Sequence, residues 1–212
     1  MNILVESYAY AIAHSDELLT AFVEHGQLVA IPLSIALILG IPLGFWSARS
    51  PLASQILTNG FNGLRVIPSI AILFLAIPYF GLSFQSAAIA LTILAIPPIL
   101  INTDVAFRTI DPTVREAAMG MGMNPAQRVQ QIEIPLAFPV ILAGIKTATV
   151  EVIASATLAA FIGAGGLGTF IVLGFSLYDN AVLLVGAIPV ALLALSVEAL
   201  LSLVHNWVQP PR

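Results

Sequence analysis

Five long apolar segments, each near the length that crosses a lipid bilayer, dominate this sequence. They cover residues 28–46, 66–82, 86–106, 136–162 and 181–204. The hydrocarbon core of a bilayer requires roughly 20 consecutive apolar residues of helix. Only 8% of the 212 residues are charged, whereas a soluble domain carries about 25%. The sequence therefore predicts an all-α membrane protein with five transmembrane helices, although Pro68 and Pro78 leave only a short apolar stretch in the second.

The distribution of basic residues predicts the orientation of these helices, because cytoplasmic loops of membrane proteins carry an excess of Lys and Arg. All seven basic residues fall on one side of the predicted bundle. They are Arg49, Arg65, Arg108, Arg115, Arg128, Lys146 and Arg212. We therefore expect the N-terminus outside and the C-terminus in the cytoplasm. Residues 1–26 are expected to form an N-terminal segment with an amphipathic helix at the outer interface, and residues 207–212 a cytoplasmic tail.

A polar loop over residues 111–135 separates the third and fourth apolar segments. Its Asp111-Pro112 pair predicts a helix start, because it places a side-chain acceptor at the N-cap and proline at the first helical position. Glycines at positions 120 and 122 end this helix, and an Asn-Pro pair starts a second one. The sequence predicts two short cytoplasmic helices hinged at glycine, which a soluble partner can approach closely. The small apolar face of the first consists of Val114, Ala117, Ala118 and Met121.

The spacing of six residues in this loop resembles a known signature. The six residues are Glu116, Ala117, Ala118, Gly122, Ile132 and Pro135. They resemble the EAA loop of binding-protein-dependent ABC importer permeases with the type I fold. The resemblance implies that residues 27–206 form the permease domain, and that the first helix of the coupling loop 111–135 docks on a cytoplasmic ATPase. The ATPase-coupling residues that it implies are Arg115, Glu116, Ala117, Ala118, Met121 and Gly122.

Four further segments resemble the osmoprotectant branch of that family, whose members import glycine betaine, choline and carnitine. They are residues 64–71, 101–103, 116–123 and 157–168. The resemblance implies a bacterial or archaeal cytoplasmic membrane, a cytoplasmic ABC ATPase dimer, a second permease chain and an extracytoplasmic solute-binding protein. It implies no nucleic acid, cofactor or metal. Asp104 departs from the family pattern, where a neutral residue is expected. A permease for methionine or another small polar solute, an ion-coupled secondary carrier and a non-transporting assembly subunit stay open as alternatives.

Three patterns associated with other functions carry little weight. Residues 163–168 satisfy G-x-G-x-x-G, but a dinucleotide site requires a strand before this motif and a helix after it. A turn that permits close helix packing, or a flexible outer-gate element, explains it better. Lys146 lacks the glycines of a phosphate-binding loop, so ATP hydrolysis requires a separate chain. The histidines do not follow metal-ligand spacing, and no catalytic constellation is evident.

Polar residues inside the apolar segments are candidates for the transport path, because charges within a membrane are costly and usually functional. Glu151 lies among small and hydroxyl residues. Two roles are open for its carboxylate, which are attraction of a cationic solute and a hydrogen bond to a neighbouring helix. Glu198 presents the same alternatives in the last segment. The translocation-path candidates are Glu151, Asn102, Asp104, Pro68 and Ser69.

Overall fold

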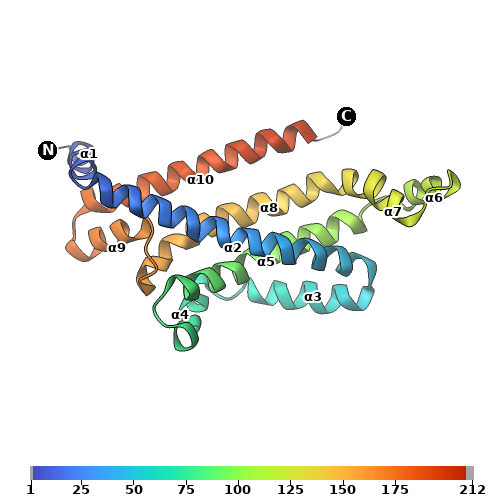
Figure 1. The fold of residues 1–212 in the computed structure, drawn as a ribbon, viewed down its shortest axis with the longest axis horizontal. Helices are drawn as coiled ribbons and strands as arrows, with labels where there is room; N and C mark the ends of the chain where they lie inside the picture. Colours follow the sequence, from blue (N-terminus) through green and yellow to red (C-terminus); the bar gives the residue numbers. More distant parts are fainter. Residues whose placement is uncertain (1, 209–212) are drawn as a thin grey trace.

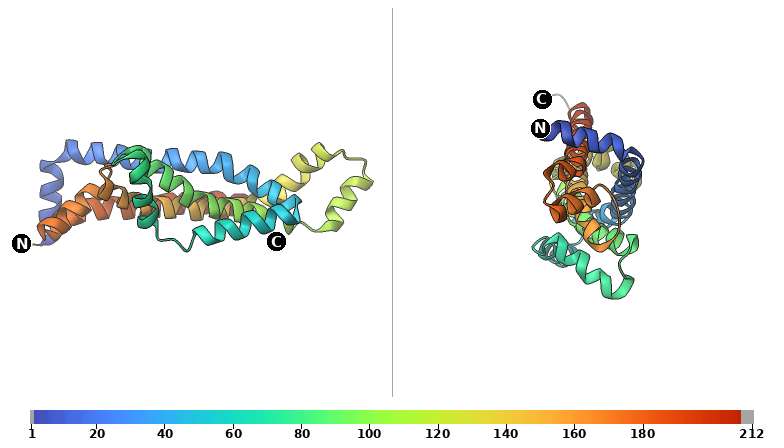
Figure 2. Two further views of the ribbon diagram at one scale, coloured as in Figure 1. Left: turned by 90° about the horizontal axis from the view of Figure 1, so that it is seen from below. Right: turned by 90° about the vertical axis from the view of Figure 1, so that its left-hand side faces the viewer.

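The computed structural model describes residues 2–208, and within that range it contains helices and turns but no strand. The molecule is elongated, with its long helices running along its length (Figure 1). The loop helices α6 and α7 project at one end, and α1 and α9 lie at the other (Figure 2). Arg212, one of the predicted cytoplasmic charges, lies outside the described residues. In chain order the elements are α1 (Ile3–Ala13), α2 (Ser15–Arg49), α3 (Pro51–Leu64), α4 (Ser69–Phe80), α5 (Phe84–Arg108), α6 (Pro112–Gly120), α7 (Pro125–Arg128), the π-helix η1 (Val129–Glu133), α8 (Ile134–Ala156), the 3-10 helix η2 (Thr157–Ile162), α9 (Gly168–Leu177) and α10 (Asn180–Val208).

The central helix is α5, which packs between α2 and α8 and is buried over most of its length. Glycines on both neighbours let the backbones approach closely. A Cβ atom at Gly44 of α2 would lie 2.6 Å from the carbonyl oxygen of Leu100, and one at Gly144 of α8 would lie 2.7 Å from that of Pro98. Lipid tails are as apolar as leucine, so membrane helices associate through close packing rather than through hydrophobic burial. The core therefore depends on a glycine contact on each side of α5.

Within residues 2–208, four helical stretches are long and apolar enough to cross a membrane, and they cover four of the five predicted spans. They are α2, α5, the run of helix from Pro125 to Ile162, and α10. The prediction for residues 66–82 differs in form, because α4 has 12 residues. This is about 18 Å of helix, against a hydrocarbon core of about 30 Å. Together α3 and α4 reach the length of a span, but they bend by 95°. Pro68 explains the break, since proline has no N–H and disfavours helix in the residue before it.

The N-terminal segment 1–26 is divided between two helices, α1 and the beginning of α2. The helix break falls at His14, and α2 then continues from Ser15 through 35 residues, about 52 Å of helix. His25 is fully buried and lies beside the backbone of Gly166, where a Cβ would be 3.3 Å from its Nδ1 atom. Residues 15–26 form the first turns of α2, and the boundary at residue 26 between the N-terminal segment and the permease domain stays a prediction. The interfacial location of the segment and the orientation of the termini stay predictions.

The glycine-rich segment 163–168 forms a turn between η2 and α9, and it follows a helix rather than a strand. Gly165 and Gly166 have φ angles of +81° and +85°, a region that glycine adopts without strain. The N–H of Gly166 donates a hydrogen bond to Glu24 Oε2 at 2.8 Å. The turn therefore ties the beginning of α2 to the beginning of α9. The sequence did not predict α9, because its apolar residues lie too close to those of the next span to stand out.

Candidate functional site

The first loop helix, α6, begins and ends where the sequence predicts. Asp111 Oδ1 accepts hydrogen bonds from the backbone N–H and the hydroxyl of Thr113, each at 2.8 Å. These bonds lower the pKa of the Asp111 carboxyl, because they stabilise its charged form. At the other end Gly122 has a φ of +80°, and the N–H of Met123 donates to the carbonyl oxygen of Ala118 at 3.1 Å. This is a Schellman motif, which satisfies carbonyls that a helix end leaves free.

The second loop helix, α7, begins at the predicted Asn-Pro pair and passes directly into a π-helix. Asn124 Oδ1 accepts a hydrogen bond from the backbone N–H of Gln127, and Gln127 Oε1 accepts one from that of Asn124, both at 2.9 Å. This reciprocal pair is a capping box. The helix then continues through η1 into α8. Short π-helical segments inside α-helices are frequent at functional sites, and this one ends at Glu133.

Four of the six predicted coupling residues lie on accessible surface of α6 and its terminus. Glu116 and Ala117 are exposed, and Met121 is 71% exposed. A Cβ atom at Gly122 would meet nothing within 4 Å. Ala118 differs, since it is 1% exposed and packs against the chain itself. The surface open to a partner is therefore made of small and flexible side chains beyond the ends of the long helices (Figure 2).

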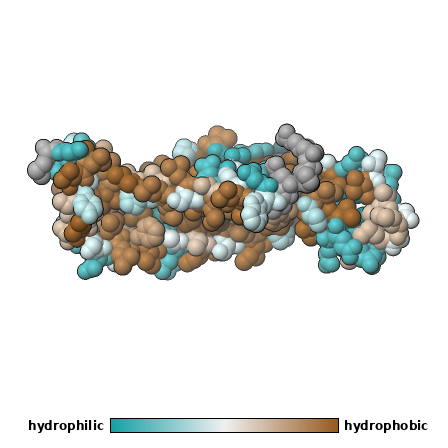
Figure 3. All heavy atoms as spheres, turned by 90° about the horizontal axis from the view of Figure 1, so that it is seen from above, coloured by the Kyte–Doolittle hydropathy of each residue, from teal (hydrophilic) through white to brown (hydrophobic). Residues whose placement is uncertain are grey.

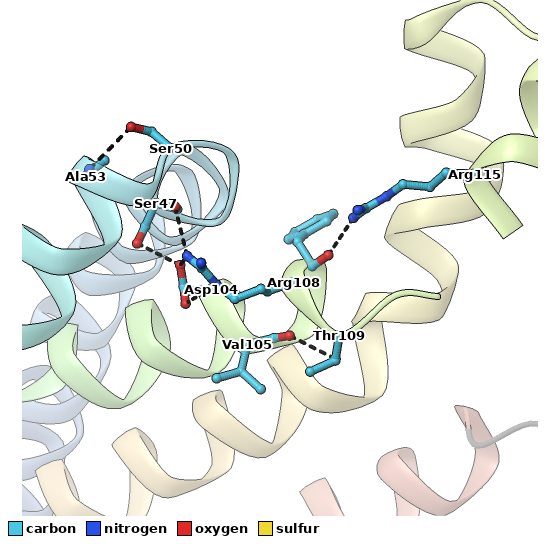
Figure 4. Close-up of polar contacts among 9 residues, drawn as sticks. Ser47, Ser50, Ala53, Asp104, Val105, Arg108, Thr109 and Arg115 are labelled. Carbon is cyan, nitrogen blue, oxygen red and sulfur yellow. Dashed lines mark hydrogen bonds and ion pairs between the residues drawn. The ribbon is translucent and has the colours of Figure 1, made fainter. Parts of the chain in front are cut away.

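The sixth predicted coupling residue, Arg115, joins a charge cluster that the sequence did not predict. The centre of this cluster is Glu133, whose side chain is 2% exposed. Glu133 Oε2 pairs with Arg49 at the end of α2, and Oε1 lies 3.2 Å from Nε of Arg115 and 3.4 Å from Nε of Arg128. Arg115 also donates to the backbone carbonyl of Phe107 (Figure 4). One buried carboxylate therefore connects α2, α6, α7 and the π-helix. We call this group of four residues the arginine cluster; its members are Arg49, Arg115, Arg128 and Glu133.

Charge is not balanced in the arginine cluster, because three guanidinium groups surround one carboxylate. The Nε atoms of Arg115 and Arg128 are buried without a hydrogen-bond partner among the described residues, although both lie within ion-pair distance of Glu133. These two contacts are thus Coulombic attractions rather than aligned hydrogen bonds. Arg49 lies 4.3 Å from the ring centroid of Phe45, a cation–π contact. A cavity of about 280 Å³ lies among the cluster, so water reaches the excess positive charge.

Asp104, a predicted translocation-path candidate, lies in the contact between α2 and α5 (Figure 4). It is 4% exposed and accepts a hydrogen bond from the Ser47 hydroxyl at 2.7 Å. Arg108 donates to its two oxygens at 2.8 and 3.2 Å and to the carbonyl oxygen of Ser47 at 3.2 Å. Both carboxylate oxygens accept hydrogen bonds, so Asp104 holds α2 and α5 together.

The other candidates for the transport path are not brought together. The amide nitrogen of Asn102 donates to the carbonyl oxygen of Pro98 at 2.8 Å, within the close contact between α5 and α8. Pro68 and Ser69 lie at the break between α3 and α4. Glu151 lines a cleft of about 700 Å³ between α8 and α10. Lys146, one of the basic residues expected on the cytoplasmic side, lies inside α8 and lines the same cleft.

Together the fold and the loop define a class of protein. The described chain is an all-helical bundle with several membrane-crossing helices, and a capped two-helix loop projects from one end. Residues 40–210 match the family described as binding-protein-dependent transport system inner membrane component. The chain belongs to this family, and it is therefore a multi-pass protein of the cytoplasmic membrane. The family predicted from the EAA-like loop is confirmed.

Relatives across most of the chain are osmoprotectant permeases. The chain is 37% identical over 197 residues to the choline transport system permease protein OpuBB of Bacillus subtilis (strain 168), covering 93% of this chain and 91% of that protein. It is 42% identical over 207 residues to the carnitine transport permease protein OpuCB of Listeria monocytogenes, covering 92% and 94%. A chain from inward-facing conformations of the MetNI methionine ABC transporter matches with a TM-score of 0.80 at 21% identity, over 93% of this chain and 99% of that chain. This likeness confirms the predicted type I ABC permease fold.

Proposed function

We propose that this chain is the membrane-spanning permease subunit of an ATP-driven importer of osmoprotectants such as glycine betaine, choline and carnitine. The observation that carries the proposal is similarity over more than 90% of the chain to permeases whose names specify choline and carnitine. The alternative substrate, methionine, is favoured by a structural likeness at 21% identity, and such a likeness reports the fold alone. An ion-coupled carrier would leave the accessible coupling loop without a role.

The accessible surface of α6 is the proposed contact with a separate cytoplasmic ATPase. Glu116, Ala117, Met121 and Gly122 are all open to a partner. Arg115 on the same helix is linked through buried Glu133 to Arg49 at the end of α2. Closure of an ATPase dimer would move α6, and the arginine cluster would carry that displacement to a membrane-crossing helix. Rigid-body movement of this kind is how alternating access is usually produced.

The proposal requires three further partners of the chain. Five spans or fewer enclose little space, so a second permease chain, identical or related, would complete the solute path. Each of the two coupling loops would engage one ATPase subunit. A solute-binding protein on the outer side would deliver the osmoprotectant, in keeping with the description of the family.

Purification from the native membrane in mild detergent, followed by mass spectrometry, tests the coupling assignment. We expect an ATPase to co-purify with the wild-type chain. The variant Ala117→Trp places a bulky side chain on the accessible face of α6 and should lose the ATPase, whereas Ala117→Ser should keep it. A chain that emerges alone from every preparation, and that transports with an ion gradient instead of ATP, would overturn the proposal.

The solute assignment needs its own measurement. The complete importer should rescue growth at high salt when glycine betaine, choline or carnitine is supplied. In membrane vesicles, an excess of each of these three solutes should compete for uptake, and an excess of methionine should have no effect. Rescue by methionine and not by betaine would show that the chain is a methionine permease instead.

A further inference from the structure

A polar cleft lies between two membrane-crossing helices, α8 and α10. Its volume is about 700 Å³, and its lining includes Lys146, Glu151 and Glu198. Cavities of about 300–1,000 Å³ are typical for binding small molecules. On the face that carries α10, Figure 3 shows hydrophilic side chains within an otherwise hydrophobic surface. The cleft therefore brings charged groups together between two helices that are long and apolar enough to cross a membrane.

An ion pair between α8 and α10 joins the two sides of the cleft. Lys146 Nζ lies 3.3 Å from Glu198 Oε1 and donates a hydrogen bond to the Ser202 hydroxyl at 2.8 Å. An ammonium group has three donors, and these two contacts among the described residues use at most two of them. The side chains of Lys146 and Glu198 are 32% and 47% exposed, and both can therefore meet a molecule that enters the cleft.

Glu151 is the second charged feature of the cleft. Its side chain is half-buried, and among the residues that the structure describes it has no hydrogen-bond or ion-pair partner, although Arg65 attracts it electrostatically. A carboxylate facing lipid in this way would be costly, so the cleft is expected to hold water or a cation. The absence of a partner on a neighbouring helix favours the first of the two roles open to Glu151. With two glutamates and one lysine in its lining, the cleft suits a cation or a zwitterion.

We propose that this cleft is a contact site for the transported solute, in which Glu151 faces the trimethylammonium group and Lys146 faces a carboxylate. The inference rests on the proposed function and names the groups that the solute would meet. A trimethylammonium group has no N–H, so a carboxylate attracts it by charge alone, and weak binding of this kind suits passage. Lys146 and Glu151 are separated by about 7.5 Å along the axis of α8. Glycine betaine and carnitine would engage both residues, and choline, which lacks a carboxylate, would engage Glu151.

Cysteine labelling of the complete importer in proteoliposomes tests the cation preference. The chain has no cysteine, so Thr147→Cys introduces a single thiol in the cleft. We expect a trimethylammonium methanethiosulfonate to react about fivefold faster than a neutral methanethiosulfonate, each rate being divided by that of the same reagent with a free thiol; this is the effect of one charge at close range in water. Glu151→Gln in the same background should remove this preference, and choline should slow the reaction. Gln131→Cys on the exposed loop is the control and should not respond to choline or to Glu151→Gln.

Uptake measurements separate the role of Glu151 from that of Lys146. Glu151→Gln should raise the apparent KM for choline and for glycine betaine. Lys146→Gln, and the double variant Lys146→Gln/Glu198→Gln that does not leave Glu198 without its lysine, should raise the KM for glycine betaine and leave that for choline unchanged. Glu17→Gln, an exposed acid on α2 outside the cleft, is the control and should change neither.

The two experiments distinguish failure of this inference from failure of the proposed function. If the wild-type importer takes up quaternary ammonium solutes, and Glu151→Gln changes neither labelling preference nor KM, the cleft is not a contact site. If the wild-type importer takes up none of them and choline does not protect Thr147→Cys, both assignments fail. If choline protects the cysteine without being transported, the cation site stands and the solute of the importer is a different one.

Discussion

Replacing Glu133 by glutamine is expected to release the coupling loop from the membrane-crossing helices. Glu133 is the one carboxylate among three arginines, and glutamine keeps its size while removing its charge. The variant leaves three guanidinium groups that repel one another across a small cavity. The first consequence should be more frequent local opening of α6 and α7, without unfolding of the spans.

The magnitude of this effect follows from burial. Removal of one member of a buried ion pair typically costs about 3–5 kcal/mol. The arginine side chains are 19–38% exposed, so hydration of the freed guanidinium groups should reduce the cost to about 2–3 kcal/mol. At 1.4 kcal/mol for each factor of ten, the opened loop should become roughly 30 to 100 times more populated. Arg49→Gln should have a smaller effect of about threefold, because Arg49 is the most exposed of the three partners.

Limited trypsin digestion measures this opening directly. Cleavage after Arg128 requires the loop to open, so its rate should follow the opened population. Cleavage after Arg65, which is exposed at the break between α3 and α4, provides an internal standard in the same sample. Glu116→Gln, a neutralised but exposed acid on α6, should leave the ratio of the two rates unchanged. A ratio within twofold of wild type in Glu133→Gln would refute the view that this carboxylate holds the loop.

Three further predictions concern packing and capping. Gly144→Ala should reduce the yield of folded protein in detergent, since its Cβ would lie 2.6 Å from a side-chain atom of α5, whereas Gly60→Ala, with nothing within 4 Å, should not. Ser47→Ala removes a 2.7 Å hydrogen bond to buried Asp104 and should lower the thermal midpoint by a few degrees, for a loss of about 1–2 kcal/mol. The pKa of Asp111 is lowered by its cap hydrogen bonds, so the cap stabilises α6 above the ordinary carboxyl pKa and is lost as pH falls through the lowered one. After correction for the intrinsic pH dependence of amide exchange, the protection of the α6 amides should therefore fall in acid in wild type and much less in Asp111→Asn.

What could be predicted from the sequence depends on how far apart the interacting residues lie. The ends of α6 were predictable because Asp111 and Gly122 act on backbone within a few positions of themselves. The arginine cluster was not, because Glu133 meets an arginine 84 positions away as well as two in its own loop. A single glutamate beside the predicted membrane boundary carries no sign of these partners. The break before α4 had a visible cause in Pro68, but its 95° angle depends on tertiary packing.

Asp104 and Glu151 show the same limit for charges inside the spans. In the sequence both are acidic residues within apolar segments, and both were therefore predicted as candidates for the transport path. Asp104 carried a local signal of a different role, because Arg108 lies four positions later on the same helix face. Ser47, which completes its environment, comes from α2 and could not be inferred. Glu151 has no basic residue four positions away, and in the structure it lines the cleft between α8 and α10.

The length of α2 has a mechanical consequence. Near its start Glu24 is fastened to the glycine turn before α9, and at its end Arg49 is fastened to Glu133. These two attachments are separated by about 38 Å of helix. Because α2 is attached near both ends, a displacement of the loop would be transmitted along α2 to the glycine turn at the opposite end of the bundle. Pro32 and Pro42 lie between these two attachments, and a bend of α2 at either proline would reduce the displacement that reaches the turn.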